Sequence, residues 1–348
     1  MSILLLGSLC TMVTTLWLSK NVSVEKEFLE AYHALADSKR DTPEALQKLY
    51  EEFFEKMSTT SLLSSIEKDQ FCHEEGHELG KVIYRRTGKN LSDSFYTCGR
   101  TCADGCYHGV FMEAFRPGEI RPEGFEHVTA DEIRPKILEI CTLSLSYQAP
   151  EECAHAVGHG LMLNLNEIAK ALDLCTVFTD MGVQYYCSTG VFMQHDIDFG
   201  LETTKNDGIY APCDTFPDRY GVACYRYKVG RIFALYPDIK DVVAICTSLS
   251  GKARLGCFHG LGVAQYSTVL NTPAMLKTIC SYGTSDSEIL ACIDGAMENV
   301  TLSDRERGKE ACDSLSSMSN EHYQEFCLSI NGKENSLERE TLPLFIPV

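Results

Sequence analysis

The sequence CHEEGHELG begins at Cys72, and related stretches follow as CYHGVFME at Cys106, CAHAVGHG at Cys153 and CSTGVFMQH at Cys187. Fainter copies start at Cys224, Cys257, Cys292 and Cys327. Consecutive copies lie 33 to 37 residues apart, except for one step of 47. A period near 35 residues is typical of stacked helical hairpins, so the repeat decides the expected fold.

Each repeat reads as two helices joined by a short polar loop. The first helix ends near a cysteine, as in 133–141, 168–175 and 241–246, and the second opens with another cysteine. The pattern predicts an all-α protein of helical hairpins that form a strongly curved solenoid or α/α ring stapled by disulfides. The expected segments are 1–20, a hydrophobic anchor or signal; 21–65, an N-terminal helical segment; 66–330, the repeat domain; and 331–348, a tail. Stretches 116–129 and 199–221 interrupt the period, and their Gly, Pro and charge content predicts long loops.

The 17 cysteines are mostly arranged in couples, and five of six couples have 10 or 11 residues between them. The couples are Cys141/Cys153, Cys175/Cys187, Cys213/Cys224, Cys246/Cys257, Cys280/Cys292 and Cys312/Cys327. Such local spacing predicts hairpin disulfides and an oxidising, extracytoplasmic compartment. Zinc–thiolate binding is the alternative, although its usual CxxC pairs are absent.

The apolar run 3–18 carries no charge. It is short for a spanning helix, and it lacks the basic start of a signal peptide. We favour an uncleaved membrane anchor; a cleaved signal and a buried helix are the alternatives. The net charge of −18 argues against a nucleic-acid partner. A protein or peptide partner on the concave face is compatible with a solenoid.

The period, the paired helices and the run Leu261, Gly262 and Tyr266 resemble disulfide-stapled tetratricopeptide-like repeat proteins. The resemblance covers the architecture of residues 66–330, and it implies an all-α solenoid that often presents a binding surface. The cysteine couples are more widely spaced here, and histidines are not part of that family's pattern. No functional residue is therefore carried over.

Histidines recur near the starts of the second helices. His73 and His77 are four residues apart, as are His155 and His159, so each pair shares one helix face. We align the pairs as equivalent because Gly76 precedes His77 and Gly158 precedes His159. The candidate metal ligands are His73, His77, His108, Glu113, His155, His159, His195 and His259. This set suits a transition metal such as zinc, iron or copper.

Two other functions are compatible with the sequence. If the histidines only pack the repeats together, the protein is a metal-free interaction scaffold. HEEGH at 73–77 also matches the HExxH signature of zinc hydrolases, with Glu74 as the general base. The second pair has Ala156 in place of that glutamate, so only the histidines repeat.

Glycines also recur within the expected helices, where each costs helix stability. We expect these glycines to permit close helix approach: Gly76, Gly109, Gly158, Gly160, Gly190, Gly260 and Gly295.

Overall fold

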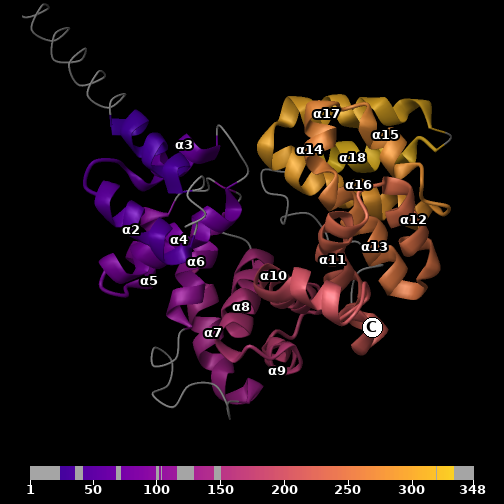
Figure 1. Cartoon of the computed structure of the whole chain (residues 1–348). Helices are drawn as coiled ribbons and strands as arrows, with labels where there is room; N and C mark the ends of the chain where they lie inside the picture. The colour runs from indigo at the N-terminus through magenta and orange to yellow at the C-terminus, as the bar shows by residue number, and fades with distance from the viewer. Residues whose placement is uncertain are drawn as a thin grey trace, which may run out of the picture. The chain divides into compact units, whose positions relative to one another are not determined.

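The computed structural model describes residues 24–35, 42–67, 72–98, 102, 104–115, 129–144, 150–318 and 320–332. Every regular element among them is an α-helix or a 3-10 turn, as predicted (Figure 1). None of the helices in these ranges is both long and apolar enough to span a membrane. The apolar run 3–18 and most of the expected loop 116–129 lie outside the described residues. The chain divides into two compact units, with the boundary between Ala114 and Phe115.

The first unit is built around two helices that carry histidines, α4 (His73–Arg86) and α6 (Gly105–Ala114). A helix at 24–35, α2 (Pro43–Phe53), α3 (Thr59–Glu67) and α5 (Leu91–Thr97) complete it. Thr42 caps α2 by accepting a hydrogen bond from the backbone N–H of Ala45, and Pro43 occupies the first turn. Phe28, Tyr50 and Phe53 are buried, and the ring of Phe28 packs against the rings of the other two.

The second unit is a succession of helical hairpins. Its helices are α7 (Ala130–Ser144), α8 (Pro150–Leu165), α9 (Ile168–Leu174), α10 (Met181–Asn206), α11 (Gly221–Leu235), α12 (Ile239–Ser248), α13 (Gly251–Ala264), α14 (Tyr266–Asn271), α15 (Met275–Cys280), α16 (Asp286–Ser303), α17 (Arg305–Ser314) and α18 (His322–Asn331). Each second helix packs against the next in the order α8, α10, α11, α13, α16, α18. The first helices pack on this row. Hairpin repeats are therefore confirmed in this unit.

Eight disulfides staple the helices, and they include all six cysteine couples predicted from the spacing. Four of the five remaining cysteines pair as Cys72–Cys102 and Cys98–Cys106, and the fifth, Cys10, lies outside the described residues. Cα–Cα distances of 5.0 to 5.7 Å are ordinary for disulfides. In the chain-entropy model, closing a loop of about a dozen residues stabilises the fold by roughly 3 kcal/mol. Each hairpin thus carries its own covalent tie.

Three helix pairs cross at the same paired motif. His-x-x-Gly on one helix meets Cys-x-x-Gly on the other. The pairs are α4 with α6, α8 with α10, and α13 with α16. A Cβ added to the second-motif glycines, Gly109, Gly190 and Gly295, would overlap the carbonyl oxygens of His77, His155 and His259, respectively. The predicted close approach of helices at glycine is therefore confirmed at these crossings.

This crossing corrects the alignment of the two histidine pairs. Because Gly109 meets His77 and Gly190 meets His155, the equivalent residues are His77 and His155. His73 lies one helical turn before the crossing and His159 lies one turn after it. The alignment through the preceding glycines was wrong by four residues, because it matched letters within one helix and ignored the partner helix.

The prediction of a loop over 199–221 is also wrong for its first part, because residues 199–206 belong to α10, which ends at Asn206. Arg231 holds this part of the helix by binding the side chain and the backbone carbonyl of Asp196 at 2.9 Å each. Gly200 is buried beneath these contacts. Contact with α11 therefore outweighs the low helix propensity of glycine.

Candidate metal centre

Three imidazoles meet in the first unit. His73 and His77 come from α4 and His108 comes from α6, and their side chains are almost completely buried. The Nδ1 atom of His108 lies 3.2 Å from Nε2 of His73. The centre of the His77 ring lies 4.6 Å from the centre of the His73 ring and 5.5 Å from the centre of the His108 ring. One ligand nitrogen from each residue lies within 4.8 Å of the others, so the three can hold a metal ion.

The close approach of α4 and α6 brings these rings together. Gly76 and Gly80 on α4 face Gly105 and Gly109 on α6, and a Cβ at Gly80 would overlap the carbonyl oxygen of Cys106. With side chains at these four positions the helices would part and the imidazoles would separate. The glycines thus set the geometry of the site, and their cost in helix propensity is about 1 kcal/mol each.

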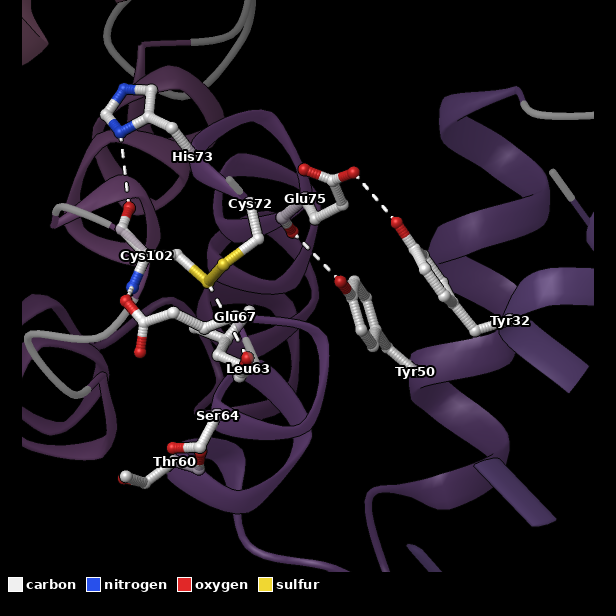
Figure 2. The surroundings of a disulfide bond; sticks show 10 residues. All are labelled: Tyr32, Tyr50, Thr60, Leu63, Ser64, Glu67, Cys72, His73, Glu75 and Cys102. Carbon is white, nitrogen blue, oxygen red and sulfur yellow. Dashed lines mark hydrogen bonds between the residues drawn. A yellow bond between two sulfur atoms is a disulfide. The ribbon is translucent and has the colours of Figure 1, made fainter. Parts of the chain in front are cut away.

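The Cys72–Cys102 disulfide positions His73 (Figure 2). Cys102 has a positive φ of 57°, and its carbonyl oxygen lies 3.3 Å from Nδ1 of His73. Because a carbonyl only accepts, this contact places the proton on Nδ1 and leaves Nε2 as the lone-pair nitrogen. Glu67 accepts a hydrogen bond from the backbone N–H of Cys102 at 2.9 Å. A backbone carbonyl that accepts from one ring nitrogen, as Cys102 does for His73, is typical of histidines that bind a metal through the other nitrogen.

The helix behind the site is held by tyrosines. In Figure 2, Tyr50 donates to the carbonyl oxygen of Glu75 at 3.2 Å, and Tyr32 donates to the side chain of Glu75 at 2.9 Å.

A second group of metal-ligand types consists of Glu67 and the sulfurs of Cys72 and Cys102, which lie close together. Those sulfurs are joined in a disulfide, so they are not thiolate ligands.

The two carboxylates of the predicted site have other environments. Glu113 is buried, and its Oε1 lies 3.3 Å from Nη1 of Arg85. Arg85 also donates to Gln47 at 2.8 Å, so Glu113 belongs to an ion-pair network. Glu74, the candidate general base of HExxH, is exposed. Arg85 was not predicted as a partner of Glu113. It lies about three turns beyond His73, at the other end of α4, and no local spacing relates it to α6.

The second unit brings His155 and His159 together on α8. Their Nε2 atoms lie 3.1 Å apart, and both side chains are buried. Nδ1 of His155 contacts Oγ1 of Thr189 at 2.7 Å, and Nδ1 of His159 contacts Oε1 of Gln194 at 3.0 Å. Both partners are on α10.

His259 and His195 lie in different surroundings within the second unit. Nε2 of His259 lies 2.9 Å from the carboxylate of Asp294, which occupies the place of Thr189 in its own crossing. Burial lowers the pKa of His259 despite this hydrogen bond. His195 lines a groove of about 630 Å³ with Phe199 and Phe216, where burial and then the charge of Lys228 lower its pKa.

A buried ion pair extends the polar interior of the second unit. Arg226 on α11 donates from Nη2 to both oxygens of Glu298 on α16, at 2.7 and 2.5 Å. Glu298 Oε2 lies 4.0 Å from Nε2 of His259. The guanidinium also lies 4.9 Å from the centre of the Tyr227 ring. No local pattern in the sequence indicates this pair, because its members are 72 residues apart.

Comparison with protein-family models, curated proteins and solved structures finds no match for this chain.

Proposed function

We propose that this protein is an extracytoplasmic helical-repeat protein that binds a transition metal through His73, His77 and His108. The observation that carries the proposal is the meeting of three buried imidazoles with ligand nitrogens within 4.8 Å of one another. Three histidines that leave a coordination position open are a common ligand set for zinc. Imidazole also suits copper and iron, so the donor set defines the class of metal and not a single element.

The surroundings of the three histidines support metal binding. The disulfide at Cys72 and the carbonyl of Cys102 orient His73 before any ligand arrives. The crossing glycines hold α6 against α4, so His108 needs no large rearrangement to reach the same point as His73. A site whose ligands are already oriented binds with a smaller loss of side-chain entropy.

The compartment and the membrane tether form a second part of the proposal. Eight disulfides are typical of proteins outside the cytoplasm. We propose that the run 3–18 tethers the repeat domain to a membrane. A strongly curved solenoid or α/α ring belongs to the same proposal, since curvature turns successive second helices toward a common centre.

Metal content tests the proposed site. The chain should be produced in an oxidising compartment, purified without chelators and measured by elemental analysis. We expect the combined His73→Gln, His77→Gln and His108→Gln variant to contain less metal than the parent, because glutamine offers no imidazole nitrogen. His33→Gln is the matched control, since His33 is an exposed histidine of the same unit. An undiminished metal content in the triple variant would contradict the proposal.

Fractionation tests the tether. We expect the full chain to sediment with membranes and to be released only by detergent, whereas a variant without residues 3–18, exported by a cleavable signal, should be soluble. The disulfide map of both proteins serves as the control for folding. Release of the full chain by high salt alone would contradict the tether and leave the metal site untouched.

A further inference from the structure

His155 and His159 have their hydrogen-bond roles set by two residues of α10. An imidazole nitrogen that binds a metal must have a lone pair, so the position of the ring proton decides which nitrogen is available. In each ring, Nδ1 faces an oxygen of α10 and Nε2 faces the other imidazole.

Thr189 determines the protonation of His155. Its hydroxyl donates to the backbone carbonyl oxygen of Tyr186 at 2.6 Å. That hydrogen is the only one the hydroxyl has, so toward His155 the Thr189 oxygen is an acceptor. Nδ1 of His155, 2.7 Å away, therefore carries the proton, and its Nε2 carries the lone pair.

Gln194 determines the protonation of His159 in a different way. Its side-chain nitrogen donates to Oδ2 of Asp198 at 2.9 Å, and a carboxylate there accepts. The amide is thereby oriented with Oε1 toward Nδ1 of His159, at 3.0 Å. Since an amide oxygen only accepts, Nδ1 of His159 carries the proton and its Nε2 carries the lone pair.

Two lone-pair nitrogens therefore face each other at 3.1 Å. A cation that both nitrogens contact removes the repulsion between them. Two imidazole nitrogens on one tetrahedral zinc ion lie about 3.3 Å apart when each bond is about 2.0 to 2.1 Å. The observed separation is close to that value without any movement of the rings.

We infer that Nε2 of His155 and Nε2 of His159 are a metal-ligand pair, and that Thr189 and Gln194 are positioning residues for it. The inference rests on the proposed function, because it takes a transition metal as the ligand. It adds a second set of donors, specifies their nitrogen atoms and assigns roles to two residues that do not touch the metal. It makes no assumption about the number of ions bound.

The test is metal affinity, measured by competition between the purified full chain and a chromophoric chelator for zinc or cobalt. The His155→Gln, His159→Gln double variant should bind at least one metal equivalent at least about 100-fold more weakly than the parent does. Thr189→Val and Gln194→Leu should each weaken binding by about 10- to 100-fold, the usual effect of removing an outer partner of a ligand. Thr189→Ser retains the hydroxyl and should restore binding.

Two control variants and one spectroscopic signature separate positioning from general damage. Thr176→Val removes an exposed hydroxyl that donates to the backbone carbonyl of Asp173, and Gln184→Leu changes a glutamine on α10 that contacts neither histidine in the pair, so both variants should bind metal as the parent does. Long-range nitrogen NMR of the metal-free protein should show the Nδ1–H form of His155. In Thr189→Val that form should give way to a mixture of tautomers.

The possible outcomes are distinct. Unchanged affinity in the His155, His159 variant would overturn this inference and leave the proposed function in place. An undiminished metal content after loss of His73, His77 and His108, together with weaker binding in Thr189→Val, would overturn the three-histidine site and leave this inference in place. If NMR shows one proton shared between the two Nε2 atoms and zinc does not displace it, the pair is a proton site and the inference is wrong.

Discussion

Replacing Gly190 with alanine should destabilise the second unit by about 3 kcal/mol, at the upper end of the usual cost of overpacking. Gly190 lies where α10 crosses α8, and an added Cβ would overlap the carbonyl oxygen of His155. The carbonyl carbon of His155 and the backbone nitrogen of His159 would lie at 2.9 and 3.0 Å. Because these atoms are backbone, no side chain can rotate away, and the helices must separate. The measurement is guanidinium unfolding with the disulfides intact.

Gly230→Ala is the matched control for this prediction. Gly230 is also a glycine within a helix, α11, but it is exposed and a Cβ there meets nothing within 4 Å. Alanine should therefore stabilise the protein by about 0.5 to 1 kcal/mol, the ordinary difference in helix propensity. Equal effects at Gly190 and Gly230 would show that the crossing is looser than described.

Arg226→Met should cost about 3 to 5 kcal/mol of unfolding free energy, because it leaves the carboxylate of Glu298 buried without its cation. The side chains of Arg226 and Glu298 are only 7% and 10% exposed. Solvent therefore cannot take over from the lost partner. Glu298→Met should have a comparable cost, because it leaves the guanidinium of Arg226 buried without its anion. Unfolding curves of the two single variants measure these effects.

The double variant Arg226→Met with Glu298→Met distinguishes a buried charge from lost packing. Removing both charges leaves neither unpaired, so most of the stability should return. The pair formed by His259 and Asp294 remains in all three variants. A double variant whose cost equals the sum of the single costs would contradict this explanation.

The repeat pattern was sufficient to predict the hairpins and six of the eight disulfides. A disulfide such as Cys175–Cys187 joins two helices across a short loop, so its partners are close in the chain and their spacing is visible in the sequence. The close approach at Gly109, Gly190 and Gly295 could also be predicted, because each glycine follows a repeat cysteine by three residues despite its cost to helix stability. The two histidine pairs were recognisable from the four-residue spacing that places both side chains on one helix face.

The register between helices was decided only by the tertiary structure. Local spacing aligned His77 with His159, whereas the crossing of α8 and α10 aligns His77 with His155. The paired motifs His-x-x-Gly and Cys-x-x-Gly do carry this information, but each has meaning only beside its partner on another helix.

The chemistry of the sites depended on tertiary contacts in the same way. Thr189 and Gln194 bind His155 and His159 from 34 and 35 residues away, and Arg226 reaches Glu298 across 72. The sequence by itself determined the helices, their covalent ties and the types of side chain available, because these follow from short-range spacing. Which nitrogen carries a proton and which charges are paired were decided by packing between helices, since those contacts join residues that no local pattern relates.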